Sequence, residues 1–309
     1  MKFLVTGGAG FIGSHIVEKL LQQNYEVHVL DNFSTGKKEN LAEFINDIQI
    51  HVGDIRNYHF VKDIMKDVEY TFHQAALSSV PRSIEDPIAT NDINVSGTLN
   101  VLNAALKSGV NKVVFASSAA IYGDDPELPK HEMLPPNPKS PYALSKLFGE
   151  HYCKLYSTVY GLPTVALRYF NVFGPKQDPN SDYAAVIPKF ITSMVEDVQP
   201  VIYGDGLQSR DFIFIDDVVS ANIKSALSNI EGGIVMNCAG GSQITVNDLA
   251  HYINKILSKD LQPIYKEERK GDIKHSFADV SLVKEKLGFE IENSFEDGLK
   301  KTLEYYKVL

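Results

Sequence analysis

Short apolar runs alternate with longer helical patterns through the first half of the chain. The runs are rich in Val, Ile and Phe and are typical of buried strands: KFLVT, EVHVLD, IQIHVGD, VEYTFHQAA, NKVVFASS and PTVALRYF. Helices are predicted between several of them, including residues 12–23 and 91–108. Because the strands are apolar throughout, helices should cover both faces of their sheet. The pattern predicts an α/β fold built on a doubly wound parallel sheet, the Rossmann arrangement.

The pattern loosens after about residue 175, where GPKQDPNSDY is rich in turn-forming residues. Beyond it a short strand is predicted at PVIYG, and helices at residues 185–196, 217–228, 246–258 and 294–307. We therefore predict a Rossmann domain over residues 1–175 and a smaller α/β C-terminal lobe over residues 176–309. Some later segments should interleave with the first domain.

Composition is ordinary for a globular protein, with 309 residues, 44% hydrophobic and 22% charged. A net charge of -9 argues against broad binding to nucleic acid or to anionic membranes. The two cysteines, Cys153 and Cys238, form no metal or disulfide pattern, which suits a reducing compartment. The first strand-like run starts at residue 2, no signal peptide is recognisable, and no apolar stretch reaches the ~18 residues of a membrane span. A cytoplasmic protein without a metal is expected.

A glycine-rich turn follows the first predicted strand. VTGGAGFIGSH contains GxGxxG from Gly8 to Gly13, directly after a strand and at the start of a helix. Such glycines allow a tight turn and close approach of the backbone to a pyrophosphate. The second strand ends in Asp31, whose carboxylate would accept hydrogen bonds from an adenosine ribose and favour NAD over NADP. Lys37 and Lys38 lie near and leave NADP open, and a purely structural turn is the alternative.

The stretch SPYALSK places a tyrosine four residues before a lysine, so the two side chains share one face of a helix. Ser140 can cap that helix, which puts Tyr142 at its positive end beside Lys146. A phenol held there could act as a base near neutral pH. Chance is the alternative, since Tyr58 and Lys62 share the spacing without any supporting motif.

Eight motifs carry a resemblance to a known family. They are TGGAGFIG, DNFSTG, GDIR, HQAA, NVSGT, SSAAIYG, YALSK and LRYFNVFGP. In this order they are similar to the extended short-chain dehydrogenases/reductases of the NAD-dependent epimerase/dehydratase family. From residue 3 to about 280 the chain most resembles the UDP-hexose and UDP-N-acetylhexosamine 4-epimerases.

The resemblance implies a catalytic trio of Ser118, Tyr142 and Lys146. Ser118 closes the VVFASS strand, and ligands of such sheets bind outside the carboxyl ends of the strands. Its hydroxyl could bond the reacting sugar oxygen. Lys146, together with the positive nicotinamide, would lower the pKa of the Tyr142 phenol. A solvated helix face is the alternative for the Tyr/Lys pair.

The resemblance also implies contacts with NAD from the glycine turn and the strand ends. They are expected from Gly7, Gly10, Phe11, Ile12, Gly13, Asp31, Asn32, Ser34, Thr35, Gly36, Asp54, Ile55, Gln74, Ala75, Ala76, Asn94, Ser117, Tyr142, Lys146 and Tyr169. Asp54 could meet the adenine amino group or could form a plain strand-end turn. Tyr169 and Phe170 would line the nicotinamide pocket, although buried core aromatics would give the same sequence. His73 is expected to pack near the cofactor.

Contacts with the UDP-sugar are implied mainly for the second half. The set is Ser118, Tyr142, Asn171, Gln177, Val186, Tyr203, Arg210, Arg269, Asp272 and Ser276. Arg210 and Arg269 match the arginines that clamp the UDP phosphates, and Asp272 matches a contact with the uridine ribose. Surface salt bridges are the alternative for the arginines. Val186 and Tyr203 match positions beside uracil, with core packing as the alternative.

Two further positions narrow the activity. Related dehydratases and decarboxylases carry an acidic residue two positions before the tyrosine of the YG pair. Ala120 stands there, beside Ala119, so no general acid is present to expel water. Ser276 stands where epimerases restricted to plain hexoses carry a tyrosine, and Gln177 matches the branch that prefers N-acetylated sugars.

The resemblance therefore implies a UDP-hexose 4-epimerase of galactose metabolism that oxidises C4 transiently with tightly bound NAD. UDP-Glc and UDP-Gal are the expected substrates, together with UDP-GlcNAc and UDP-GalNAc. The alternatives are another nucleotide-sugar reaction (4-reduction, dehydration or decarboxylation), a different nucleotide base, or a catalytically idle dinucleotide sensor. A homodimer is implied through helices at 91–108 and 142–159, whose spacing alone would equally fit intramolecular packing.

Overall fold

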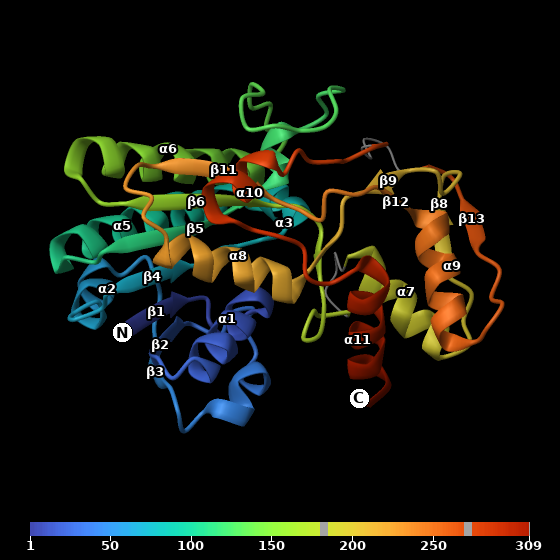
Figure 1. Cartoon of the computed structure of the whole chain (residues 1–309), viewed down its shortest axis with the longest axis horizontal. Coiled ribbons are helices and arrows are strands. Elements are labelled where there is room, and N and C mark those ends of the chain that lie inside the picture. The colour runs from blue at the N-terminus through green and yellow to red at the C-terminus, as the bar shows by residue number, and fades with distance from the viewer. Residues whose placement is uncertain (180–184, 269–273, 309) are drawn as a thin grey trace.

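A seven-stranded parallel sheet forms the centre of the protein (Figure 1). The computed structural model describes residues 1–179, 185–268 and 274–308. From one edge to the other the strands are β11 (Ile234–Cys238), β6 (Thr164–Tyr169), β5 (Lys112–Ser118), β4 (Tyr70–His73), β1 (Lys2–Thr6), β2 (Glu26–Asp31) and β3 (Gln49–Val52). Every neighbouring pair is parallel. The predicted doubly wound fold is confirmed.

Helices cover both faces of this sheet, which explains the continuously apolar strands. One face packs against α1 (Phe11–Gln22), α8 (Ile215–Leu227) and α10 (Ser281–Leu287), and the other against α2 (Tyr58–Ile64), α5 (Gly97–Ser108) and α6 (Pro141–Tyr160). Along β1, Phe3 and Val5 belong to one buried cluster and Leu4 to the other. Successive side chains therefore alternate between two dry layers.

The second lobe lies beside this sheet, on the right in Figure 1. It packs α7 (Val186–Val195), α9 (Val246–Leu257) and α11 (Phe295–Val308) together. Three two-stranded sheets accompany them: β7 (Val172–Phe173) with β10 (Ile213–Phe214), β9 (Ser209–Arg210) with β12 (Ile244–Thr245), and β8 (Val201–Tyr203) with β13 (Ile264–Lys266). Phe214 and Leu299 belong to the same buried cluster as Val5. One continuous core thus joins the two lobes.

The six predicted strands are confirmed, and the structure adds β11 to their sheet. Both β11 and α8 come from beyond residue 175 and pack against the large sheet, so the chain interleaves there. The helix predicted at 91–108 is part of a longer run. It begins as α4 (Pro87–Asn91), capped by Asp86, and passes through a π-helical turn, η2 (Asp92–Ser96), into α5.

The remaining described elements are short: α3 (Val80–Glu85), η1 (Lys38–Phe44) and η3 (Ala119–Tyr122). None of the helices in the described ranges has the length and apolarity needed to cross a membrane. Cys153 and Cys238 are buried free thiols. Within the same ranges, no group of three or more His, Cys, Asp or Glu side chains is placed to hold a metal ion.

Candidate functional site

The carboxyl ends of β1, β2, β4, β5 and β6 meet at one edge of the large sheet. From β1 the chain passes to β2 on one side, and β4 lies on the other side. The connections on the two sides of β1 therefore run in opposite directions, and a crevice for a ligand opens outside this edge. Several of the sequence-predicted cofactor residues, among them Gly7, Asn32 and Gln74, lie in the loops that leave these strands.

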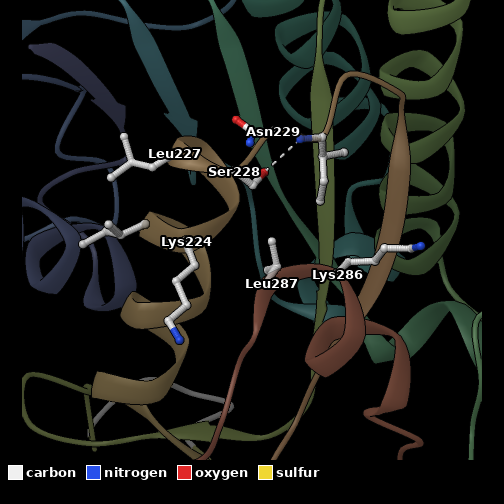
Figure 2. Close-up of a pocket in the computed structure, with 8 residues that line it drawn as sticks. Lys224, Leu227, Ser228, Asn229, Lys286 and Leu287 are labelled. Carbon is white, nitrogen blue, oxygen red and sulfur yellow. Dashed lines mark hydrogen bonds between the residues drawn. The ribbon is translucent and has the colours of Figure 1, made fainter.

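A surface hollow of about 590 Å³ lies away from this crevice, between α8 and α10 (Figure 2). Lys224, Ser228 and Leu287 are among the residues that line it. Lys112, the first residue of β5, donates a hydrogen bond from Nζ to the Ser228 carbonyl at 2.6 Å. The hollow therefore adjoins the amino ends of the strands, on the side opposite the candidate site.

The glycine turn after β1 closes tightly on itself. The Gly10 N–H donates to the Gly7 carbonyl at 3.1 Å, and a Cβ on Gly13 would lie 2.1 Å from that carbonyl oxygen. Gly7 has a φ of 69°, which favours glycine. No side chain caps α1, whose first turn carries no acidic residue, so its N–H groups can receive an anion. This cradle suits the pyrophosphate of a dinucleotide, with Phe11 and Ile12 at the helix start.

Asp31 ends β2 as predicted, and its carboxylate supports the glycine turn. One oxygen accepts the Ala9 N–H at 2.9 Å, and the other accepts the Phe33 N–H at 2.8 Å. Burial raises the pKa of Asp31 against the effect of these backbone bonds. Each carboxylate oxygen has a further lone pair, so an additional bond to a ribose hydroxyl remains chemically available.

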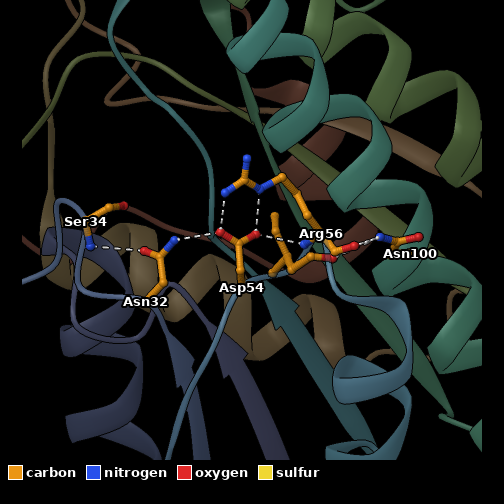
Figure 3. Close-up of polar contacts among 6 residues, drawn as sticks. Asn32, Ser34, Asp54, Arg56 and Asn100 are labelled. Atoms are coloured by element: carbon orange, nitrogen blue, oxygen red, sulfur yellow. Dashed lines mark hydrogen bonds and ion pairs between the residues drawn. The ribbon is translucent and has the colours of Figure 1, made fainter.

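The loop after β2 and the end of β3 share a polar network (Figure 3). Asn32 accepts the Ser34 N–H and donates its side-chain amide to Asp54 at 3.0 Å. Asp54 also accepts the Arg56 backbone N–H and pairs with the Arg56 guanidinium at 2.8 Å, which lowers the pKa of Asp54 to about 2. Asp54 thus forms a strand-end turn, and a contact of its carboxylate with an adenine amino group stays a prediction. Thr35 and Gly36 continue this loop toward the helix start.

Gln74 and Tyr169 link the ends of β4 and β6. Gln74 Nε2 donates to the Tyr169 hydroxyl at 3.1 Å, and that hydroxyl donates to Asn222 Oδ1 on α8 at 2.8 Å. Ala75 and Ala76 follow Gln74, and a Cβ on Gly7 would lie 2.7 Å from the Ala75 backbone nitrogen. These residues thus line the crevice beside the glycine turn. Sequence analysis missed Asn222, because a lone Asn in a helix carries no motif.

Phe170 and His73, near these strand ends, have ring side chains that are buried in the core. Phe170 is buried against Tyr122, with ring centroids 6.1 Å apart, so the core alternative holds for it. His73 is buried between the hydroxyls of Thr6 and Thr98, at 2.7 and 2.9 Å. Burial lowers the pKa of His73 to about 3, so the ring is neutral. The expected packing role of His73 is confirmed.

Three predicted cofactor contacts have side chains engaged elsewhere. Asn94 is buried in η2 and bonds both the N–H and the carbonyl of Leu77, and also Ser145. The Ser117 hydroxyl donates to the buried Glu150 at 2.6 Å, on the face of β5 opposite to Ser118. Ile55 is buried in the core. These side chains brace the protein, so the predicted contacts of Asn94, Ser117 and Ile55 with a dinucleotide would come from their backbone groups.

The structure brings Ser118, Tyr142 and Lys146 together at the mouth of the crevice. Ser140 caps α6 by accepting the Ala143 N–H, as predicted, which puts Tyr142 in the first turn. The Tyr142 and Ser118 side chains lie near enough for the hydroxyl of Ser118 to favour the phenolate of Tyr142. Lys146 Nζ lies 5.8 Å from the centre of the Tyr142 ring and donates to the Ala116 carbonyl at 2.8 Å. The geometry is that of a phenol between a hydroxyl and an ammonium.

Without the cofactor, the surroundings of this trio oppose the phenolate. Burial raises the pKa of Tyr142, and the nearby Ser118 hydroxyl only opposes this shift. Burial also lowers the pKa of Lys146, which is 4% exposed, to about 8. In the protein alone the pKa of the phenol is therefore not lowered. A positive charge brought in with the cofactor is needed to favour the phenolate.

The second lobe brings several predicted substrate residues together. The Ser276 N–H donates to the Ser209 carbonyl at 3.1 Å, directly beside Arg210. The Asn171 side-chain amide donates to the Asp211 carbonyl at 2.8 Å. Ser276, Arg210 and Asn171, from three distant segments, thus form one group.

The other predicted substrate residues lie on separate elements. Val186 begins α7, and Tyr203 ends β8 with its carbonyl bonded to the Gln208 side chain. Gln177 donates its side-chain amide to the Val172 carbonyl at 3.2 Å. These bonds tie Tyr203 and Gln177 to nearby parts of the chain. Arg269 and Asp272 lie outside the described residues.

Comparisons with known proteins agree with this geometry. A family model described as "NAD dependent epimerase/dehydratase family" matches residues 3–239. The UDP-N-acetylglucosamine 4-epimerase of Methanobrevibacter ruminantium M1, solved with UDP-N-acetylmuramic acid, is 44% identical with a TM-score of 0.95, over 99% of this chain and 98% of that one. The UDP-glucose 4-epimerase of Thermus thermophilus, solved with NAD, is 36% identical with a TM-score of 0.90, over 99% of each chain. A UDP-N-acetyl-alpha-D-glucosaminuronate decarboxylase of Bacillus cytotoxicus is 32% identical, over 98% of this chain and 97% of its own length.

The fold and the phosphate cradle define a Rossmann enzyme that binds a dinucleotide. The chain belongs to the NAD dependent epimerase/dehydratase family. It is an enzyme of that family and NAD is its cofactor, in agreement with the fit of the glycine turn to a pyrophosphate.

We predict that Gly13→Ala abolishes NAD binding. The added Cβ would sit 2.1 Å from the Gly7 carbonyl oxygen, so the turn must open, at a cost of about 1–3 kcal/mol in the free energy of unfolding. The measurement is the NAD content of the purified protein together with its thermal midpoint. Gly232→Ala is the control, because a Cβ there meets nothing within 4 Å. Full NAD content in Gly13→Ala would contradict the assignment of the cradle.

Proposed function

We propose that the protein is a UDP-hexose 4-epimerase that interconverts UDP-Glc with UDP-Gal and UDP-GlcNAc with UDP-GalNAc, with NAD bound throughout. The observation that carries the proposal is the convergence of Ser118, Tyr142 and Lys146 at the edge where the glycine turn opens. Similarity to 4-epimerases over nearly the whole chain supports it.

Tyr142 is the proposed base for the sugar 4-hydroxyl. NAD held by the glycine turn of Gly7, Gly10 and Gly13 would supply a reversible hydride acceptor for C4, so the reaction would have no net oxidation. Ser118 lies within hydrogen-bonding reach of the phenol and can bridge it to the reacting oxygen. Lys146 supplies positive charge to the phenolate from one helical turn away. Tyr142 then returns the proton to the same oxygen after the sugar has turned.

The sugar must present its other face while the nucleotide stays bound. Among the residues that the structure describes, Arg210 is proposed to hold the diphosphate. Its guanidinium also donates to the Ser209 carbonyl at 2.9 Å. That bond fixes the orientation of the planar guanidinium group, whose N–H donors suit phosphate oxygens. Anchoring the diphosphate leaves the hexose free to rotate between the two half-reactions.

Dehydration and decarboxylation, the rival reactions in this family, would need an acidic side chain that this chain lacks at the matching position. Dehydration and decarboxylation relatives use an acid at the position of Ala120, and Ala119 next to it is equally inert. In the structure, the Ala120 N–H donates to Ser118 at 3.2 Å, so this turn serves the trio through its backbone. Similarity to a decarboxylase therefore does not outweigh the missing acid. A catalytically idle sensor is disfavoured because the trio is complete.

Acceptance of N-acetylated sugars is proposed from the small Ser276 side chain. Its backbone is fixed beside Arg210, so its side chain lies close to the proposed diphosphate contact. A serine there leaves space for a substituent on C2 of the sugar. A larger pocket can accept an N-acetylated sugar without excluding a smaller, plain hexose. Gln177 is proposed to contribute its side-chain amide to the binding of N-acetylated sugars.

The function is tested by incubating the purified protein with UDP-GlcNAc, without added NAD, and following UDP-GalNAc by NMR. We expect conversion toward an equilibrium mixture, and likewise for UDP-Glc, with kcat/KM compared between the two pairs. Inactivity toward the acetylated pair alone would contradict the interpretation of Ser276. Inactivity toward both pairs, or formation of a dehydrated or decarboxylated product, would contradict the epimerase proposal.

Tyr142→Phe should lower the rate by about 10²- to 10⁴-fold, since general base catalysis is lost while the ring still packs. The fold and NAD content should stay unchanged, as read by circular dichroism and absorbance. Tyr58→Phe is a matched control, because Tyr58 has the same spacing to Lys62 without a neighbouring serine or glycine turn. Near-normal turnover in Tyr142→Phe would refute the role of the phenol.

We also propose a homodimer formed through the helices at 91–108 and 142–159, the second of which lies in α6. The outer face of α6 carries an apolar stripe of Leu144, Phe148, Leu155 and Val159, each 43–61% exposed. These positions recur at the spacing of one helix face, and such a stripe in water favours burial against a partner. A second copy offers the same stripe about a two-fold axis, which closes the assembly. We further propose a cytoplasmic location, on the grounds that Cys153 and Cys238 are free thiols, which suit a reducing compartment.

The dimer is tested by light scattering. The wild-type protein should show twice the mass of the chain, and Phe148→Glu should shift it to the monomer because a charge would be buried at the centre of the stripe. Leu207→Glu, at an equally exposed apolar residue of the other lobe, should leave the mass unchanged. A monomeric wild type would contradict the proposal.

A further inference from the structure

A buried carboxylate lies directly after the proposed phosphate contact Arg210. Asp211 is 0% exposed and follows β9. Oδ1 accepts the N–H groups of Gly240 and Gly241 at 2.8 and 3.1 Å, and Oδ2 accepts the Ala278 N–H at 3.1 Å. None of the ion pairs among the described residues includes Asp211. Backbone amides therefore stabilise its charge.

The segment at 276–279 is held on both sides. Toward β9, the Ser276 N–H donates to the Ser209 carbonyl at 3.1 Å. Toward the loop after β5, Lys130 donates to the Phe277 carbonyl at 2.7 Å and accepts the Asp279 N–H at 2.8 Å. The Ala278 N–H points away from Lys130 and is taken by Asp211. Asp211 thus supplies the side-chain bond that fixes the segment that carries Ser276.

The backbone of Asp211 serves a third segment. Its carbonyl accepts the side-chain amide of Asn171 at 2.8 Å, and Ile213 donates its N–H to the Asn171 carbonyl at 3.2 Å. Asp211 therefore lies next to all three residues that are proposed to contact the UDP-sugar. It follows Arg210 in the chain, it bonds Asn171 directly, and it bonds Ala278, two residues after Ser276.

The energetics favour a positioning role over a stabilising one. Burial raises the pKa of Asp211 to about 7, against the lowering effect of the amides of Ala278, Gly240 and Gly241. The folded pKa lies above the ordinary value, so the stability that this shift contributes is present at acid pH and is lost as the pH rises through about 7. The ionised carboxylate is thus costly to bury, but its bonds to amides are strong and directional.

We propose that Asp211 is a positioning residue for the UDP-sugar, which sets the distance between Ser276 and Arg210 by fixing the amide of Ala278. The inference rests on the proposed function, since it assigns these two residues to substrate. It predicts that disturbing Asp211 weakens nucleotide binding while the NAD cradle and the trio of Tyr142 stay intact.

Asp211→Asn is the sharpest variant. One amide oxygen can still accept from Gly240 and Gly241, whereas the amide nitrogen would face the Ala278 N–H and cannot accept from it. We expect KM for the UDP-sugar, and Kd for UDP by calorimetry, to rise about tenfold or more, with kcat changed less than about threefold and NAD content unchanged. Hydrogen exchange should increase in a peptide covering residues 276–279.

Asp217→Asn is the matched control. Asp217 is 1% exposed and also accepts a backbone N–H, that of Glu292 at 2.9 Å, on a segment away from the proposed substrate residues. We expect the Asp217 variant to show no change in KM or in Kd for UDP. If Asp211→Asn does not fold, Asp211→Ser replaces it, because its hydroxyl can accept one amide and leaves space for water.

The outcomes separate the two proposals. Unchanged KM and Kd in the Asp211 variant, or an equal change in the Asp217 control, would overturn the positioning role. A wild type that binds UDP but epimerises no substrate would contradict the proposed function, while Kd for UDP would still test Asp211. A wild type that does not bind UDP would overturn both.

Discussion

Burial of the parallel sheet on both faces is the constraint on which the site depends. Helices exclude water from both faces of the sheet, so polar groups of the chain lie at the strand ends. At the end of β1, Gly13 packs so closely against the Gly7 carbonyl that it has no room for a Cβ. The N–H groups of α1 are left open as a consequence, and the loops of five strands gather around them.

Burial also influences the protonation of the proposed base, Tyr142. It raises the pKa of Tyr142 and lowers that of Lys146, so both side chains are pushed toward their neutral forms. The protein therefore supplies a positioned phenol, and its activation depends on positive charge that arrives with the cofactor. Such an arrangement ties the strength of the proposed base to an occupied NAD cradle.

The substrate half is assembled differently, through backbone hydrogen bonds between distant segments. Residues at 276–279 run between Ser209 and Lys130, and Asp211 holds them through Ala278. The same residue bonds Asn171 through its carbonyl. The proposed substrate contacts therefore depend on one another for position, whereas the glycine turn forms from a single local stretch.

The sequence alone determined the strands of the sheet, the cap at Ser140, the glycine turn and the helix face shared by Tyr142 and Lys146. Each of these features depends on residues that are neighbours along the chain. Tertiary structure decided which way polar side chains point. Asn94 and Ser117 turn inward to Leu77 and Glu150, and Asp54 turns to Arg56. It also placed β11 in the main sheet and buried Asp211 among amides of remote segments. Most of these features depend on partners many residues away, which no short motif encodes.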